Sequence, residues 1–150
     1  MQSFVYPAAL TPDEKDGGFV VTFVDFPEAI TQGEEVAEAL GEAADCLEEA
    51  VANRMAMELP LPKASKVKKG QYAIPLPALT AAKAALYLAV RDTCITKVEL
   101  AQCLQCDEKE VRRLLDIRHP SKLPRLESAL AALGRQLIVG VQQAPLIRQV

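Results

Sequence analysis

Three potential metal ligands stand at a spacing that zinc sites use. Cys103 and Cys106 are separated by two residues, and His119 follows after twelve more. This is the opening of a zinc-finger pattern, because Zn²⁺ prefers thiolate and imidazole ligands. The second histidine is missing, since His119 is the only histidine in the chain, and Cys46 and Cys94 are distant in sequence. We therefore expect no metal site and no cofactor, and we expect the cysteines to be reduced thiols.

The same two cysteines fit a helix-turn-helix window of twenty residues that begins at Lys97. Two helices that cross near a right angle need a small residue where they approach closest and apolar residues on the facing sides. The predicted core positions are Leu100, Ala101, Leu104, Cys106, Val111 and Leu114. Asp107 is a suitable N-cap for the second helix. Gln105 stands where glycine is usual, so a left-handed backbone there would cost roughly 1 kcal/mol.

Basic side chains surround this window. The second helix of such a motif lies in the DNA major groove, where outward side chains read the bases and arginine can grip guanine through paired donors. Lys109, Arg112 and Arg113 occupy the outward positions, and cations at helix starts and in the next loop suit phosphates. The expected DNA-binding residues are Lys97, Lys109, Arg112, Arg113, Arg118, His119 and Lys122. An ordinary helical domain with a basic surface is the alternative.

Acidic residues recur every three or four positions after Gly33. They are Glu35, Glu38, Glu42, Asp45 and Glu49. On a helix this spacing stacks the carboxylates into one ridge, where like charges repel by a few tenths of a kcal/mol per pair. Such a ridge suits a basic partner protein, although the spacing alone favours a simpler interpretation, the solvated face of an amphipathic helix.

Catalytic chemistry finds little support in the residue types. A metal-dependent nuclease needs carboxylates that converge from several strands. Asp25 and Glu28 bracket the exit of one predicted strand, but the first predicted strand, residues 4–10, contains no acid. Nucleophilic catalysis would need a base, and the single histidine lies in the other half of the chain. We expect that the protein is not an enzyme.

Strands and one long helix are predicted for the first half of the chain. Alternating and β-rich apolar residues predict strands over residues 4–10 and 19–24, joined by turn residues. A short strand is expected near residues 29–31. After Gly33 apolar residues recur every three or four positions, which predicts a helix from about Glu34 to Met57.

Helices dominate the prediction for the second half. A linker rich in proline and lysine spans about residues 60–70, and one more strand is expected at residues 71–76. The helical pieces that follow are expected at residues 79–91, 97–104, 108–115 and 126–134. The β-branched stretch Leu137 to Val141 predicts a short terminal strand.

Composition places the chain among globular proteins, and charge divides it. Half of the 150 residues are hydrophobic and 25% are charged, which excludes disordered and collagen-like classes. No apolar run suits a membrane helix, and the N-terminus does not resemble a signal peptide, so we expect a cytoplasmic protein without membrane contact. The net charge of −3 combines −11 over residues 1–60 with +8 over the remainder. This asymmetry predicts two modules whose partners have opposite charges.

Several stretches carry a resemblance to a known family. They are Tyr6-Pro7-Ala8, Leu10-Thr11-Pro12, Gly17-Gly18-Phe19 leading into Val21 to Asp25, FPEAITQGEEVAEAL from Phe26 to Leu40, and the helix-turn-helix region that ends in Ala131 to Gly134. In these stretches, which span about residues 3–141, the chain resembles the HicB antitoxins. These proteins are partners of HicA toxins, which cleave mRNA, in bacterial toxin–antitoxin operons.

The resemblance implies a function for each half. It implies an N-terminal partial RNase H fold that lacks the catalytic acids and masks the active site of a toxin, which is typically basic. It also implies a C-terminal domain of the phage-repressor or XRE type that dimerises and binds its own operator. Other members carry a ribbon-helix-helix there, but the window positions favour the helix-turn-helix. The acidic residues then become candidate toxin contacts: Asp25, Glu28, Glu35, Glu38, Glu42, Asp45 and Glu49.

The sequence therefore predicts an α+β protein with two domains. Residues 1–77 form a partial RNase H-like sheet with one long helix, and residues 78–150 form an all-α helix-turn-helix domain with a short terminal strand. The predicted function is an antitoxin that neutralises a HicA-type toxin and represses its own operon, as a homodimer through the C-terminal domain or as a tetramer. The alternative is a helix-turn-helix regulator whose N-terminal domain senses a ligand or another protein.

Overall fold

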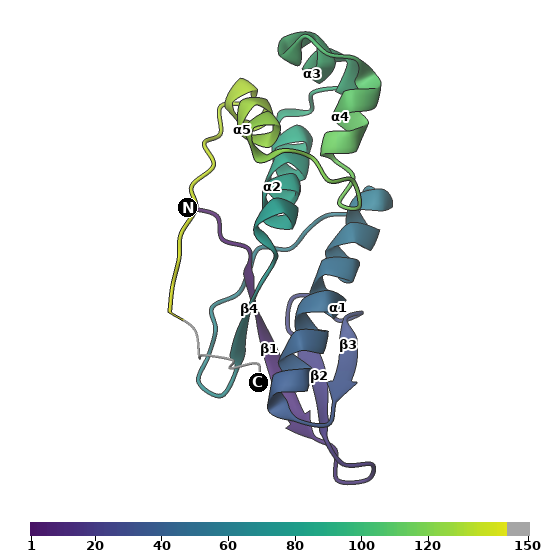
Figure 1. Cartoon of the computed structure of the whole chain (residues 1–150), viewed down its shortest axis with the longest axis vertical. Helices are drawn as coiled ribbons and strands as arrows, with labels where there is room; N and C mark the ends of the chain where they lie inside the picture. Colours follow the sequence, from purple (N-terminus) through teal and green to yellow (C-terminus); the bar gives the residue numbers. More distant parts are fainter. Residues whose placement is uncertain (144–150) are drawn as a thin grey trace.

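The first part of the chain is a four-stranded antiparallel sheet with one long helix against one face (Figure 1). The structure is a computed structural model, and it describes residues 1–143. The strands are β1 (Val5–Pro12), β2 (Phe19–Phe23), β3 (Ile30–Gly33) and β4 (Tyr72–Pro75), in the spatial order β3-β2-β1-β4. β4 returns from beyond the helix and pairs with β1, with Ile74 opposite Tyr6. The chain thus has the predicted α+β architecture.

The turn between β1 and β2 follows from local chemistry. The Asp13 carboxylate accepts hydrogen bonds from the backbone N–H groups of Lys15 and Asp16, at 3.0 and 3.2 Å. Gly18 has a φ of +73°, and a Cβ there would lie 2.6 Å from the Gly33 carbonyl oxygen. Because only glycine fits both conditions, this position sets how closely the turn approaches the end of β3.

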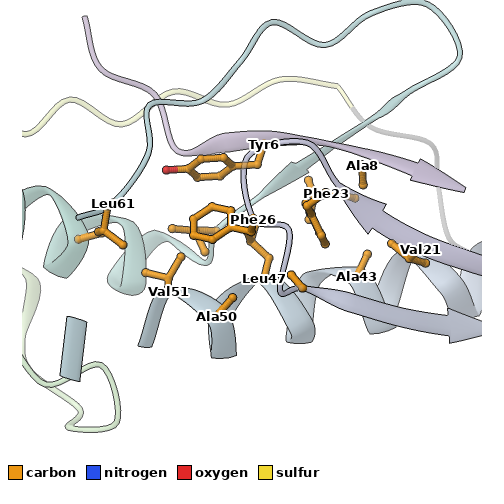
Figure 2. Close-up of a cluster of buried hydrophobic side chains, with 14 of the residues drawn as sticks. Tyr6, Ala8, Val21, Phe23, Phe26, Ala43, Leu47, Ala50, Val51 and Leu61 are labelled. Atoms are coloured by element: carbon orange, nitrogen blue, oxygen red, sulfur yellow. The ribbon is translucent and has the colours of Figure 1, made fainter. Parts of the chain in front are cut away.

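The helix α1 (Val36–Ala56) buries one stripe of side chains against the sheet, consistent with its predicted period. The buried residues of this stripe are Ala39, Ala43, Leu47, Ala50, Val51 and Met55. Figure 2 shows this first core, with Tyr6 and Phe26 facing the helix residues. The rings of Tyr6 and Phe26 meet edge to face, with centroids 5.0 Å apart, which is a favourable aromatic geometry.

Four helices follow β4 along the chain. They are α2 (Ala78–Thr93), α3 (Lys97–Leu104), α4 (Glu108–Leu114) and α5 (Leu123–Ala132). Their second core contains Ala82, Leu86, Ala89, Leu100, Ala101, Val111, Leu114, Leu126, Ala129 and Leu130. The helix predicted at residues 126–134 begins earlier, at Leu123, because proline at position 124 suits a first helical turn. In Figure 1, α3 and α4 lie at the opposite end of the molecule from the β1–β2 turn.

The two cores share helix α2. Ala84 and Tyr87 of α2 are buried in the first core, whereas Ala82 and Leu86 are buried in the second. The Tyr87 hydroxyl donates to the Leu59 carbonyl oxygen at 2.6 Å. This hydrogen bond holds the segment after α1 against α2. Because α2 contributes to both cores, it connects α3 and α4 to the sheet.

One predicted element is absent. Over residues 133–143 the structure contains no strand, so the expected terminal strand at Leu137 to Val141 is wrong. β-Branched residues favour strands only where a neighbouring strand pairs with them, and no segment of the described chain does so here. Residues 144–150 of the predicted C-terminal domain lie outside the described residues. Among residues 1–143, the helices are all too short or too polar to cross a membrane.

Candidate nucleic-acid interface and acidic surface

Helices α3 and α4 are stabilised at their N-termini by their own side chains. The Thr96 hydroxyl accepts from the Glu99 N–H at 3.1 Å, and Glu99 in turn accepts from the Thr96 N–H at 3.3 Å. At the start of α4, the Asp107 carboxylate accepts from the Glu110 N–H at 2.8 Å. Each cap satisfies backbone donors that a helix start leaves unpaired. The predicted capping role of Asp107 is confirmed.

The turn between α3 and α4 depends on one left-handed residue. Gln105 has φ 54° and ψ 43°, and the next N–H, that of Cys106, donates to the Ala101 carbonyl oxygen at 3.0 Å. This sharp reversal lets α4 pack across α3. Ala101 is buried and provides the small side chain that this crossing needs.

The six residues predicted as the core of this motif lie on the inner side of the helices. Leu100, Val111 and Leu114 are fully buried. Leu104 and Cys106 are half-buried and pack against the second core. The thiol of Cys106 and that of Cys103, which is exposed, belong to free cysteines.

Most cations predicted to bind DNA are exposed, and several are already ion-paired. On α4, Arg112 pairs with Glu108 at 2.7 Å and Arg113 with Glu110 at 3.7 Å. Both arginine side chains remain substantially exposed, at 65% and 44%. Exposed pairs of this kind within one helix contribute only a few tenths of a kcal/mol, so a phosphate or a base can replace the carboxylate.

The other candidate cations differ in their surroundings. Lys109 and Lys122 are exposed and make no ion pair within residues 1–143. Lys97 lies 3.9 Å from Glu58, beyond the end of α1. The His119 side chain is half-buried, and its Nδ1 lies 3.2 Å from the Ser121 hydroxyl oxygen. This contact holds the imidazole against the chain that follows α4.

The loop that joins α4 to α5, residues 115–122, contacts α1. Leu115 and Ile117 pack against the first core. Arg118 donates to the Glu49 carboxylate of α1 at 2.6 Å, and this hydrogen bond raises the pKa of Arg118. A cleft of about 400 Å³ lies beside this contact. Its lining includes Lys97 and Arg112, so the candidate DNA-binding cations border the end of α1.

Lys83 of α2 is a residue that sequence analysis missed. Its side chain is fully buried, and its three ammonium N–H groups are shared among four oxygen acceptors between Arg113 and Ser121, at 2.6 to 2.9 Å. Burial lowers the pKa of Lys83, and the charges of Asp116 and Glu110 oppose this effect. Periodicity could have identified the position, because Lys83 falls on the apolar face between Leu79 and Leu86.

The acidic ridge, defined as Glu35, Glu38, Glu42, Asp45 and Glu49, lies along α1 and its start. All five side chains are exposed, and within residues 1–143 only Glu49 forms an ion pair. Glu38 also accepts a hydrogen bond from the Glu34 N–H at 3.3 Å. The ridge from Glu35 to Asp45 thus presents carboxylates that no cation of the described chain neutralises.

Asp25 and Glu28 have internal partners instead. Asp25 accepts from the Ser65 hydroxyl and N–H, at 2.5 and 2.9 Å. Glu28 binds the Arg54 guanidinium through two hydrogen bonds of 2.6 and 2.9 Å, which hold the pKa of Glu28 below its usual value. The same guanidinium lies over the Phe26 ring, 4.9 Å from its centroid. These two carboxylates therefore attach the segment after α1 and the α1 terminus to the sheet.

Comparison with known proteins extends over nearly the whole chain. Residues 5–85 match the family described as the HicB-like antitoxin of bacterial toxin–antitoxin systems. Antitoxin HicB of Escherichia coli strain K12 is 37% identical over 132 residues, which cover 88% of this chain and 95% of that protein. This chain belongs to the HicB antitoxin family. The family resemblance of the sequence motifs is thereby confirmed.

Further HicB relatives match both halves of the chain. Antitoxin HicB 1 of Photorhabdus laumondii is 34% identical over 91% of this chain and 86% of that protein. Antitoxin HicB of Pseudomonas fluorescens is 32% identical over 95% of this chain and 98% of its own length. HicB membership implies a toxin partner in a toxin–antitoxin system. The relatives are named as antitoxins and not for an enzyme activity.

Proposed function

We propose that this protein neutralises a HicA-type toxin that cleaves mRNA, and that it represses its own operon by binding operator DNA. The observation that carries the proposal is the similarity to Antitoxin HicB proteins over 88% to 95% of the chain, which includes both the sheet and the later helices. The charge division supports two partners, because a basic toxin suits the acidic half and DNA suits the basic half.

In this proposal the sheet and α1 form a partial RNase H-like domain, residues 1–77, that binds the toxin. The contact surface is the part of the acidic ridge from Glu35 to Asp45, because its carboxylates are exposed and unpaired by other side chains of residues 1–143. A basic toxin would replace their mutual repulsion with attraction. Asp25 and Glu28 contribute less, because binding a toxin would require them to give up their hydrogen bonds to Ser65 and Arg54.

In the same proposal residues 78–150 form a helix-turn-helix domain of the phage-repressor type, with α4 as the recognition helix. Lys109, Arg112 and Arg113 project from α4 toward base edges, and Arg118 and Lys122 bind phosphates. A homodimer would place two copies of α4 on the half-sites of a palindromic operator, about one helical turn apart.

Operator binding is tested with the double variant Arg112→Ala/Arg113→Ala. We expect the variant to lose specific binding to a duplex from upstream of its own operon, because each arginine that reads a base contributes about 1–3 kcal/mol. The measurement is fluorescence anisotropy against specific and scrambled duplexes. Arg135→Ala, which removes an arginine that is 45% exposed and paired with Asp92, is the control for loss of a surface cation and should bind normally. Wild-type protein that shows no preference for the specific duplex would exclude the repressor function.

Toxin binding is tested with Glu42→Lys/Asp45→Lys. We expect this variant to lose co-purification with the basic product of the adjacent gene and to fail to rescue growth, because two attractive sites become repulsive. The control Glu14→Lys/Asp16→Lys makes the same change in charge at the β1–β2 turn and should retain both properties. If the ridge variant still co-purifies with toxin at low salt, the ridge is only a solvated helix face.

A further inference from the structure

Lys83 holds its charge in the core without a carboxylate partner. The side chain is fully buried in the middle of α2, where a lysine is rare unless its charge is compensated. Within residues 1–143 it forms no ion pair. Its Nζ lies instead 2.9 Å from the Arg113 carbonyl oxygen, 2.6 Å from that of Asp116, 2.7 Å from that of His119 and 2.8 Å from the Ser121 hydroxyl oxygen.

All four acceptors belong to one short stretch, the end of α4 and the loop after it. The last carbonyl groups of a helix have no partner within the helix, and they form the negative end of its dipole. An ammonium group presents its three donors from a single point, so several carbonyl oxygens can converge on it. Lys83 therefore neutralises the end of α4 and fixes the backbone path that leaves it.

The side chains of this stretch point to a role in DNA binding. Arg113 and His119 have their carbonyl groups held directly by Lys83, and Arg118 lies between two anchored residues, Asp116 and His119. The loop also has hydrogen bonds of its own, from the His119 N–H to the Asp116 carbonyl oxygen at 3.1 Å and from the Arg118 N–H to the Asp116 carboxylate at 3.0 Å, but Lys83 is the group that joins its carbonyl oxygens to α2. A displacement of this backbone would move three candidate DNA contacts together.

We propose that Lys83 is a positioning residue for operator binding, which sets the end of the recognition helix and the loop after it without touching DNA. This inference rests on the proposed operator binding by α4. Lys83 itself is inaccessible to a phosphate because its side chain is fully buried. Its effect on affinity passes through the backbone of Arg113 to Ser121.

The test replaces Lys83 with methionine, which keeps an unbranched stem as far as Cε and removes the ammonium group with its three donors. Operator affinity is measured by anisotropy over a series of salt concentrations on full-length protein whose folding is verified by circular dichroism. We expect Lys83→Met to weaken binding at least about tenfold, a loss comparable with that of one well-placed arginine. A plot of log affinity against log salt concentration has a negative slope. We expect this slope to become shallower by about 0.9 for each phosphate that the variant no longer binds.

Leu86→Ala separates positioning from general loss of stability. Leu86 is fully buried in the same helix and core, one turn after Lys83, and it makes none of the hydrogen bonds to the loop. When the measurement is corrected for the fraction of folded protein, we expect the operator affinity of Leu86→Ala to depend on salt concentration as that of the wild type does. An equal change of slope in both variants would show a merely structural role and would overturn the proposal.

The remaining outcomes are also decisive. If Lys83→Met folds and binds the operator with wild-type affinity and slope, the proposal is wrong. If Lys83→Met does not fold, Ser121→Ala takes its place, because it removes one acceptor from a half-buried side chain, and wild-type binding by this variant would overturn the proposal. Failure of the wild-type protein itself to bind would instead refute the proposed repressor function. Toxin neutralisation should remain intact in Lys83→Met.

Discussion

The turn between α3 and α4 contains a strained residue that glycine should relieve. Gln105 adopts a left-handed backbone with φ 54°, although it carries a side chain. That side chain is exposed and makes no hydrogen bond within residues 1–143, so its removal breaks no hydrogen bond. The backbone N–H of Gln105, which donates to the Gln102 carbonyl oxygen at 3.2 Å, is retained by any substitution except proline.

The expected gain follows from two opposing terms. A left-handed conformation costs an L-residue roughly 1–2 kcal/mol, and glycine avoids this cost. Glycine also loses about 0.5–1 kcal/mol more backbone entropy on folding than alanine does. We therefore expect Gln105→Gly to raise the free energy of unfolding by about 0.5–1 kcal/mol. For a chain of this size the melting temperature would rise by about 1–4 °C.

Urea denaturation followed by circular dichroism measures this effect. Gln105→Ala keeps the Cβ and should leave stability within about 0.5 kcal/mol of the wild type. Gln102→Gly makes the same substitution three residues earlier, inside α3, and should cost about 1 kcal/mol because that backbone is helical. A Gln105→Gly variant that is less stable than the wild type, or a Gln105→Ala variant that gains as much stability, would contradict the strain assigned to Gln105.

Two further substitutions test how the sheet is attached to α1. Glu28→Gln removes the pair with Arg54 and should lower stability at pH 7 by up to about 1 kcal/mol. Because this ion pair lowers the pKa of Glu28, its contribution is present above the pKa of the unfolded carboxyl and is lost as pH falls below about 4. Melting curves of variant and wild type should therefore converge in acid, and a constant difference would contradict this. Leu47→Ala should cost about 2–5 kcal/mol by chemical denaturation, since Leu47 is fully buried, whereas Leu59→Ala, at a side chain 42% exposed, should cost far less.

The sequence predicted the elements well wherever the signal was local. The helix expected at residues 97–104 has these bounds in the structure, and the Asp107 cap is present. The β1–β2 hairpin and the long helix also follow from periods of two and three to four residues. The terminal strand failed because β-branched composition is a local preference, whereas a strand also needs a partner.

The candidate site was predicted less completely than the fold. Arg112 and Arg113 could be identified from their positions in the window, and both are exposed on α4. The internal role of Glu28 could not be foreseen, because its partner Arg54 lies 26 residues later. The contact between Arg118 and Glu49 joins residues 69 apart, one from each half of the chain.

By itself the sequence determined the family, the order of most elements, the helix caps and the separation of charge into an acidic and a basic half. These properties depend on residue type and on neighbours a few positions away. Only the tertiary structure decided which charges are available to partners. The ridge from Glu35 to Asp45 stays unpaired among residues 1–143, while Asp25 and Glu28 are bound internally. Lys83 shows the reason most directly, because a charge can be buried only where folding brings together enough oxygen atoms, here from residues 30 to 38 positions away.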